Sequence, residues 1–220
     1  MQAILRCQQE EAFVSKIRSF RLALLPALGA MLAWTVAAPA QVGFSEGYKF
    51  LEAVKKKNGN DVTDMLAKGS PTLVNARDIS TGESALHQVT ARRDLTWMQF
   101  LIAKGANVNI RDFKGVTPLV VAVNNNFAEG VDLLVGRGAK IDESNNAGET
   151  PLITAVHNRN VPMMRILLKA GADPDRADNS GRSARDYATA EGKGNNLLTE
   201  IENNAKPKTK GAAKTYGPNF

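Results

Sequence analysis

Two series of glycines recur along this chain of 220 residues, and both keep the same interval. The first series is Gly82, Gly115, Gly148 and Gly181; the second is Gly105, Gly138 and Gly171, each followed by an alanine. An interval of about 33 residues is typical of a solenoid, in which each repeat buries its apolar face against its neighbours. The spacing therefore predicts a stack of similar units.

Each unit carries the signals of two helices and a turn. Thr117-Pro118 and Thr150-Pro151 can each start a helix, because the threonine hydroxyl accepts an amide hydrogen bond and proline in the first turn loses none. Apolar residues at helical spacing between Met163 and Leu168 predict a second helix in the fourth unit. That helix is predicted to end at Gly171, where a left-handed cap needs no Cβ.

These units resemble ankyrin repeats. The resemblance rests on Ser-Ala-Leu-His at Ser84 to His87, on Thr-Pro-Leu at Thr117 and Thr150, and on the glycine-alanine pairs of the second series. It implies an all-α repeat solenoid, an ankyrin stack of helix-turn-helix units with protruding β-hairpin turns, over residues 41–203. The units, including degenerate caps, are predicted at residues 44–78, 79–112, 113–145, 146–178 and 179–203.

The two ends depart from the pattern, as terminal repeats of a solenoid do where one face meets water. The loop from Gly69 to Asp78 is two residues longer than that from Gly105 to Asp112, so we expect a distorted first hairpin. In the last unit, Arg185 stands where the pattern has a buried leucine. A final short helix is predicted to use Leu197, Leu198 and Ile201. Residues 204–220 have no apolar periodicity and are predicted to be a basic disordered tail.

Residues 1–40 have the pattern of an export signal. Basic residues outnumber acidic ones in the leader by two, and the apolar run Leu22–Ala37 leads to the small-x-small site Ala38-Pro39-Ala40. The run is shorter than the roughly 20 residues of a spanning helix. We therefore predict cleavage between Ala40 and Gln41 and a periplasmic or secreted protein. An uncleaved signal that anchors the chain in the inner membrane is the alternative, and the long leader leaves the true start codon open.

The formal net charge of +6 lies at the two ends of the chain. The leader contributes +2 and the lysines of the tail contribute +4, whereas residues 41–203 are neutral. The basic composition therefore does not predict a nucleic-acid partner for the folded stack. Its recognition must depend on shape and on patterned side chains.

The sequence contains no motif of an enzyme, a cofactor site or a metal site. Cys7 is the single cysteine, and the resemblance gives His87 a structural role, a hydrogen bond to the neighbouring unit. His157 lies at a different place in its own unit, so the two histidines do not form a pair. The aspartates of the last loop lack the glycine and glutamate of a calcium loop: Asp173, Asp175 and Asp178.

The resemblance implies a partner-binding concave face, built from the hairpin tips and the first helices. At the tips, the family's contact positions are Ser80, Thr81, Glu83, Phe113, Lys114, Val116, Asn146, Ala147, Glu149, Asn179, Ser180 and Arg182. At the ends of the first helices, they are Arg92, Arg93, Asn124, Asn125, His157 and Asn158. Phe113 is either an anchor for a partner or folded back on its own hairpin. Trp97 is predicted to lie in the core with Phe100 and Leu101.

The leading functional prediction is a monomeric, non-enzymatic interaction module in the bacterial envelope that binds an unidentified protein. Regulation of an envelope enzyme and neutralisation of a toxin are both compatible with it. An alternative of another class is electrostatic binding of an anionic lipid, polysaccharide or nucleic acid by Lys206, Lys208, Lys210 and Lys214. Tyr216 is the one aromatic residue among these lysines, which favours a solvated tail.

Overall fold

A computed structural model describes residues 45–192 and 196–205. The predicted signal peptide with its cleavage site, and the lysines of the tail, lie outside these residues. The described residues form ten α-helices, one short 3-10 helix and no regular β-strand. The helices are α2 (Glu46–Lys55), α3 (Gly59–Lys68), η1 (Leu73–Asn75), α4 (Ala85–Ala91), α5 (Leu95–Ala103), α6 (Pro118–Asn124), α7 (Ala128–Gly136), α8 (Pro151–His157), α9 (Val161–Ala170), α10 (Ala184–Ala190) and α11 (Asn196–Asn204).

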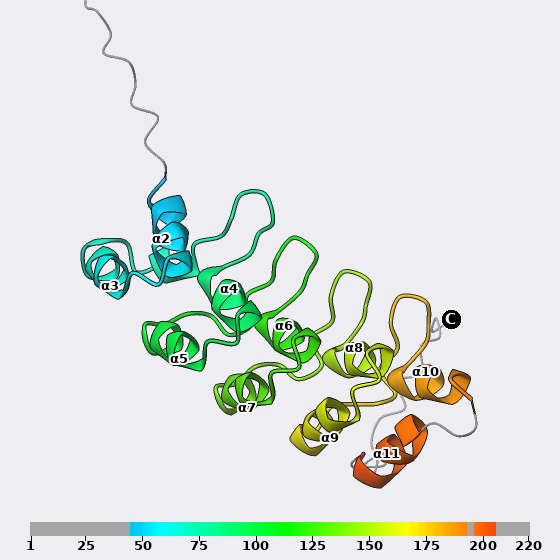
Figure 1. Cartoon of the computed structure of the whole chain (residues 1–220). Helices are drawn as coiled ribbons and strands as arrows, with labels where there is room; N and C mark the ends of the chain where they lie inside the picture. The colour runs from blue at the N-terminus through cyan, green and yellow to red at the C-terminus, as the bar shows by residue number, and fades with distance from the viewer. Residues whose placement is uncertain (1–44, 193–195, 206–220) are drawn as a thin grey trace, which may run out of the picture. The chain divides into compact units, whose positions relative to one another are not determined.

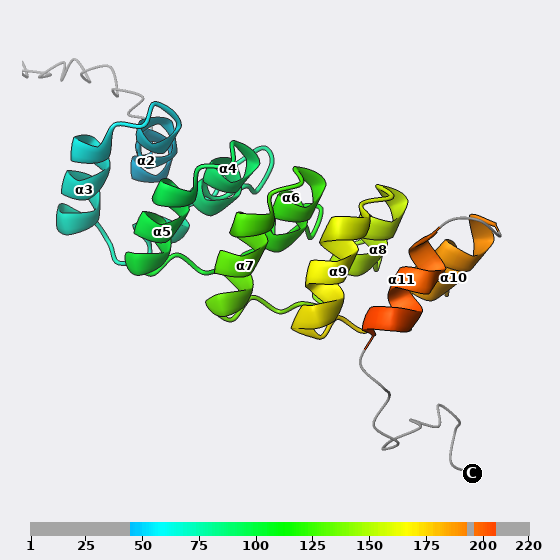
Figure 2. The same ribbon diagram turned by 60° about the horizontal axis from the view of Figure 1, so that its bottom comes forward.

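The helices pair in chain order, from α2 with α3 to α10 with α11. The first members of the pairs lie side by side and form what we call the inner row: α2, α4, α6, α8 and α10 (Figure 1). The second members form the outer row: α3, α5, α7, α9 and α11 (Figure 2). Long loops join each outer helix to the next inner helix and project beside the inner row (Figure 1). This arrangement confirms the predicted stack of helix-turn-helix units.

Polar caps and proline start the helices where the sequence predicted them. Thr150 Oγ1 accepts a hydrogen bond from Ile153 N at 3.2 Å, and Pro151 occupies the first turn of α8. Helix α9 ends at Gly171, which has a φ of 101° and caps the helix in the left-handed conformation. The capping signals read from the sequence are therefore confirmed.

The short turns between paired helices place four non-glycine residues in the left-handed region, with φ between 49° and 57°. This conformation costs about 1–2 kcal/mol for a residue with a Cβ. All four side chains contact the following unit: Lys57 at Asp94, Arg93 at Phe127, Asn126 at Asn160 and Arg159 at Glu191. A glycine would relieve the backbone but would remove these contacts between units.

The core repeats with the interval of the glycines. Leu86, Leu119 and Leu152 are at most 1% exposed, and each holds the same place in its own unit. The next place in this series is Arg185, which is half-buried, and its Nε lies 2.8 Å from Asp175 Oδ1. The arginine therefore closes the series with an ion pair at the edge of the stack.

The first and last units are closed differently from the middle ones. The extra residues of the first loop form η1, and its Leu73 and Val74 are buried. At the other end, Leu197 and Ile201 of α11 are buried, as predicted, whereas Leu198 is only half-buried. Arg165 of α9 holds α11 through two hydrogen bonds of 2.7 and 2.8 Å to the Glu200 carboxylate.

Candidate functional site

Backbone hydrogen bonds join the tips of the four projecting loops in a row. Each bond runs from a residue near one tip to the residue before the glycine of the preceding loop: Phe113 N to Thr81 O at 3.0 Å, Asn146 N to Lys114 O at 3.0 Å and Asn179 N to Ala147 O at 3.1 Å. Side-chain amides add two more bonds, from Asn146 Nδ2 to Phe113 O and from Asn179 Nδ2 to Asn146 O, both at 2.9 Å. Each tip is thus positioned by its neighbour.

Each loop is also closed internally by the side chain at its start. Oδ1 of Asp112 accepts from Lys114 N at 2.8 Å and from Val116 N at 2.7 Å. Three other residues accept two amide hydrogen bonds in the same way: Asp78, Asn145 and Asp178. Hydrogen bonds from the Ser80 side chain and from the Ser80 and Thr81 amides lower the pKa of Asp78. These side chains therefore shape the loops.

The glycines of the first series allow the loops to approach each other. Gly148 has a φ of 82°, and a Cβ built on it would lie 2.5 Å from the Asn179 backbone nitrogen. Gly115 is similar, because a Cβ there would lie 2.8 Å from Asn146 N. Gly115 and Gly148 are therefore required by both backbone conformation and space, whereas Gly181 has open space around its built Cβ and is required by conformation alone.

His87 links two units, as the resemblance implied. Its Nδ1 accepts a hydrogen bond from Ser84 N at 3.1 Å, which leaves Nε2 to carry the proton donated to Val116 O at 3.0 Å. Burial lowers the pKa of His87. The geometry fits a neutral structural imidazole.

Most of the predicted contact residues lie at the surface of the loops and the inner row. Those exposed to solvent are Ser80, Thr81, Glu83, Arg93, Phe113, Lys114, Asn124, Asn125, Asn146, Ala147, His157, Asn158, Asn179, Ser180 and Arg182; Val116 and Glu149 are half-buried. Arg92 points into the stack instead. Its Nη1 donates to Val54 O, the end of α2, at 2.9 Å, and its guanidinium lies 5.7 Å from the Trp97 ring. We therefore assign Arg92 a structural role, in which it stabilises the packing of the second unit against the first.

Tyr187 of α10 brings three predicted contact residues into one cluster. Its ring packs edge-on against His157 with centroids 4.4 Å apart, and the Arg182 guanidinium lies 4.4 Å from the ring centroid. Glu149 Oε1 lies 3.7 Å from His157 Nδ1. The Tyr187 hydroxyl donates to Asp178 Oδ2 at 2.6 Å and lowers the pKa of Asp178. Sequence analysis missed Tyr187, because an aromatic in an inner helix has the pattern of a core residue.

Comparison with known protein families agrees with this geometry. A model described as ankyrin repeats in three copies matches residues 50–145, and one described as ankyrin repeats in many copies matches residues 139–188. Together these ranges cover well over half of the chain. The chain belongs to the ankyrin repeat family. Ankyrin repeats are protein-protein interaction modules, so the coarse prediction of an interaction module is confirmed. The family is generally a non-enzymatic scaffold.

Curated relatives of this ankyrin repeat protein include diacylglycerol kinase iota of Mus musculus and of Homo sapiens, each 38% identical over 66 residues. The matched segment is 30% of this chain but 6% of each kinase. The chain therefore spans a small part of these relatives, and the similarity is confined to the repeats.

The ankyrin loops expose two large apolar side chains, of which sequence analysis identified one. Phe113 is 56% exposed, and its ring lies over Gly82 and 5.6 Å from the Arg77 guanidinium, on the preceding loop rather than on its own. Ile79 is 92% exposed. The signal for Ile79 was available, because Asp78 and Gly82 are one residue further apart than Asp112 and Gly115.

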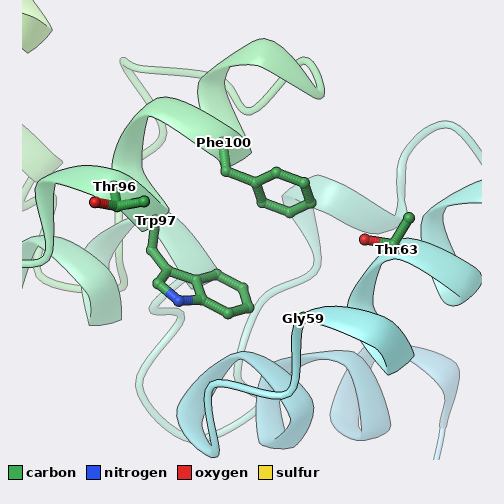
Figure 3. Close-up of a pocket in the computed structure, with 5 residues that line it drawn as sticks. All are labelled: Gly59, Thr63, Thr96, Trp97 and Phe100. Carbon is green, nitrogen blue, oxygen red and sulfur yellow. The ribbon is translucent and has the colours of Figure 1, made fainter.

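A pocket of about 210 Å³ lies in the outer row of the ankyrin stack. It is lined by Trp97 and Phe100 of α5, which face Gly59 and Thr63 of α3 (Figure 3). The two rings are 5.7 Å apart and nearly perpendicular. Leu101 is buried as predicted, whereas Trp97 and Phe100 are half-buried and pack against the edge of the core. The helical period placed them on α5 but could not show the space beside α3.

The described part of the ankyrin chain offers neither a cluster of metal ligands nor a helix that could span a membrane. Across residues 45–192 and 196–205, no three His, Cys, Asp or Glu side chains are grouped so that they could hold a metal ion. Over the same residues, no helix is both long and apolar enough to cross a membrane.

Proposed function

We propose that this ankyrin repeat protein is exported to the bacterial envelope and there binds a partner protein through its loop face. The loop face consists of the four tips, residues 78–83, 112–116, 145–149 and 178–182, with the exposed ends of α4, α6 and α8. The observation that carries the proposal is the row of hydrogen bonds between neighbouring tips. It favours a surface organised before a partner arrives.

Preorganisation matters because ordering a flexible loop on binding costs free energy. Within each loop, a side-chain oxygen accepts two amide hydrogen bonds, and between loops the tips are bonded to each other. The exposed side chains of Lys114, His157 and Arg182 are therefore presented on a backbone that is already ordered. A partner would have to order mainly side chains.

The proposed export rests on the leader, with its apolar run and its small-x-small site before Gln41. A periplasmic or secreted protein of this kind could regulate an envelope enzyme or neutralise a toxin. The electrostatic alternative through the lysine-rich tail depends on residues outside the described ranges.

The proposed face can be tested by reversing charge on it. We expect the double variant Lys114→Glu with Arg182→Glu to lower recovery of the envelope partner roughly tenfold or more in affinity capture, because each reversal replaces an attractive charge by a repulsive one and like charges across an interface disfavour binding. The matched control is Arg137→Glu with Lys169→Glu, two exposed cations of the outer row. We expect normal recovery with this control.

Equal loss in both double variants would contradict the proposed face, because a general change of charge would then explain the effect. Deletion of residues 206–220 separates the electrostatic alternative. If that deletion alone abolishes capture, the lysine-rich tail carries the binding and the loop face does not.

A further inference from the structure

The first two loop tips depart from the pattern of the later ones in the same chemical direction. Phe113 occupies the place of Asn146 and Asn179, and Ile79 is the extra residue of the first loop. Both changes put a large apolar side chain into solvent, with 56% of Phe113 and 92% of Ile79 exposed. We call these two residues the apolar tip.

The apolar tip lacks a side-chain hydrogen bond that the later loops make to the loop before them. The side-chain amides of Asn146 and Asn179 donate to the preceding loop, whereas a phenyl ring at position 113 has no donor. An isoleucine that is almost fully exposed adds nothing to the core. Large apolar side chains that donate no hydrogen bond between the loops and fill no core are typical of a surface that a partner covers.

The charges beside the apolar tip indicate the chemistry of that partner. Arg77 and Lys114 are exposed and form no ion pair within the described residues. Arg77 Nε donates to Gly82 O at 3.0 Å, but a guanidinium has further N–H donors and keeps its full charge. The carboxylates of Asp78 and Asp112 already accept amide hydrogen bonds of their own loops. Glu83 is the one exposed carboxylate in these two loops without such a bond. The cations are therefore better placed than the carboxylates to meet a partner's charge.

We propose that the apolar tip binds a protein segment that presents a large apolar side chain flanked by carboxylates. The apolar side chain packs on Ile79 and Phe113, and the carboxylates pair with Arg77 and Lys114. Charge complementarity of this kind speeds association and selects among partners. The inference rests on the proposed function and names the chemistry of the partner at one end of the loop face.

The chain itself supplies the variant that tests this proposal. Phe113→Asn copies the residue of the next two loops, and its amide can bond the first loop as Asn146 bonds the second. Ile79→Ser removes a side chain that is 92% exposed. We expect the double variant to keep the unfolding midpoint of the parent chain, so a loss of binding cannot be attributed to unfolding.

The probe is a short fluorescent peptide with a central Leu-Phe pair between glutamates, compared with a twin that carries lysines instead. We expect the glutamate peptide to bind the full chain and to perturb the amide NMR signals of residues 77–83 and 112–116. The double variant should weaken this binding about tenfold or more. The lysine twin should bind at least about tenfold more weakly than the glutamate peptide.

The proposal is overturned if the two peptides bind equally, if the signals move elsewhere, or if the double variant binds like the parent. It is also overturned if the parent chain binds phosphatidylglycerol vesicles but not the peptide, and the double variant no longer binds the vesicles. The apolar tip would then contact a membrane. The two proposals can fail separately. If the peptide does not bind, but the variant Lys114→Glu with Arg182→Glu still lowers capture of the envelope partner, the proposed partner chemistry is rejected and the proposed function stands.

Discussion

Replacing Gly148 with alanine should lower the free energy of unfolding by about 2–5 kcal/mol. Gly148 has a φ of 82°, a conformation that costs a residue with a Cβ about 1–2 kcal/mol. The new Cβ would also lie 2.5 Å from the Asn179 backbone nitrogen, which cannot move without breaking its bond to Ala147 O. Urea unfolding followed by circular dichroism measures the change.

Gly181→Ala is the matched control for this prediction. Gly181 has nearly the same φ, 80°, but no neighbouring heavy atom within 4 Å of its built Cβ. Gly181→Ala should therefore lower the free energy of unfolding only by the cost of the left-handed conformation, about 1–2 kcal/mol. If both variants lose the same amount, the close approach of neighbouring tips adds nothing to stability and our description of the loop row is wrong.

Replacing His87 with alanine should lower the free energy of unfolding by about 2–4 kcal/mol. The substitution leaves Ser84 N and Val116 O without their imidazole partner, and a buried polar group without a partner costs about 1–3 kcal/mol. The damage should spread beyond one unit, since Val116 belongs to the following loop. The same urea titration measures it, and a loss well below about 1 kcal/mol would contradict the bridging role.

His87 should also give the stability a dependence on pH. Burial lowers its pKa in the folded chain, whereas the unfolded side chain has a pKa of about 6.5. Below that pH the unfolded chain binds a proton that the folded chain does not, so the stabilisation present above a pH of about 6.5 is lost as pH falls through the folded pKa. His87→Ala should lack this decline, and the control His157→Gln should keep it.

The fold could be predicted because its signals are local and repeated. The glycine periods, the Thr-Pro helix starts and the leucine series each recur at a fixed spacing, and each has a physical reason that the structure confirms. Arg185 shows that a departure can also be located in advance. The sequence did not show that Arg185 forms an ion pair with Asp175, which compensates for the missing leucine.

The candidate site was harder to predict, because the side chains there are placed by contacts between units. Arg92 stands at a position that the family uses for binding, yet its guanidinium lies against the end of α2. Tyr187 gathers His157 and Arg182 from other elements, which no spacing in one helix indicates. The extra residue between Asp78 and Gly82 is visible in the sequence, but the 92% exposure of the Ile79 side chain is known only from the structure.

The central claim, that the loop face binds the partner, is tested most directly by hydrogen exchange of the full chain with and without the captured partner. We expect slower exchange for amides in residues 78–83, 112–116, 145–149 and 178–182, with exchange in α5, α7 and α9 unchanged. Slower exchange confined to the outer row, around Trp97 and the pocket beside α3, with unchanged loops would contradict it.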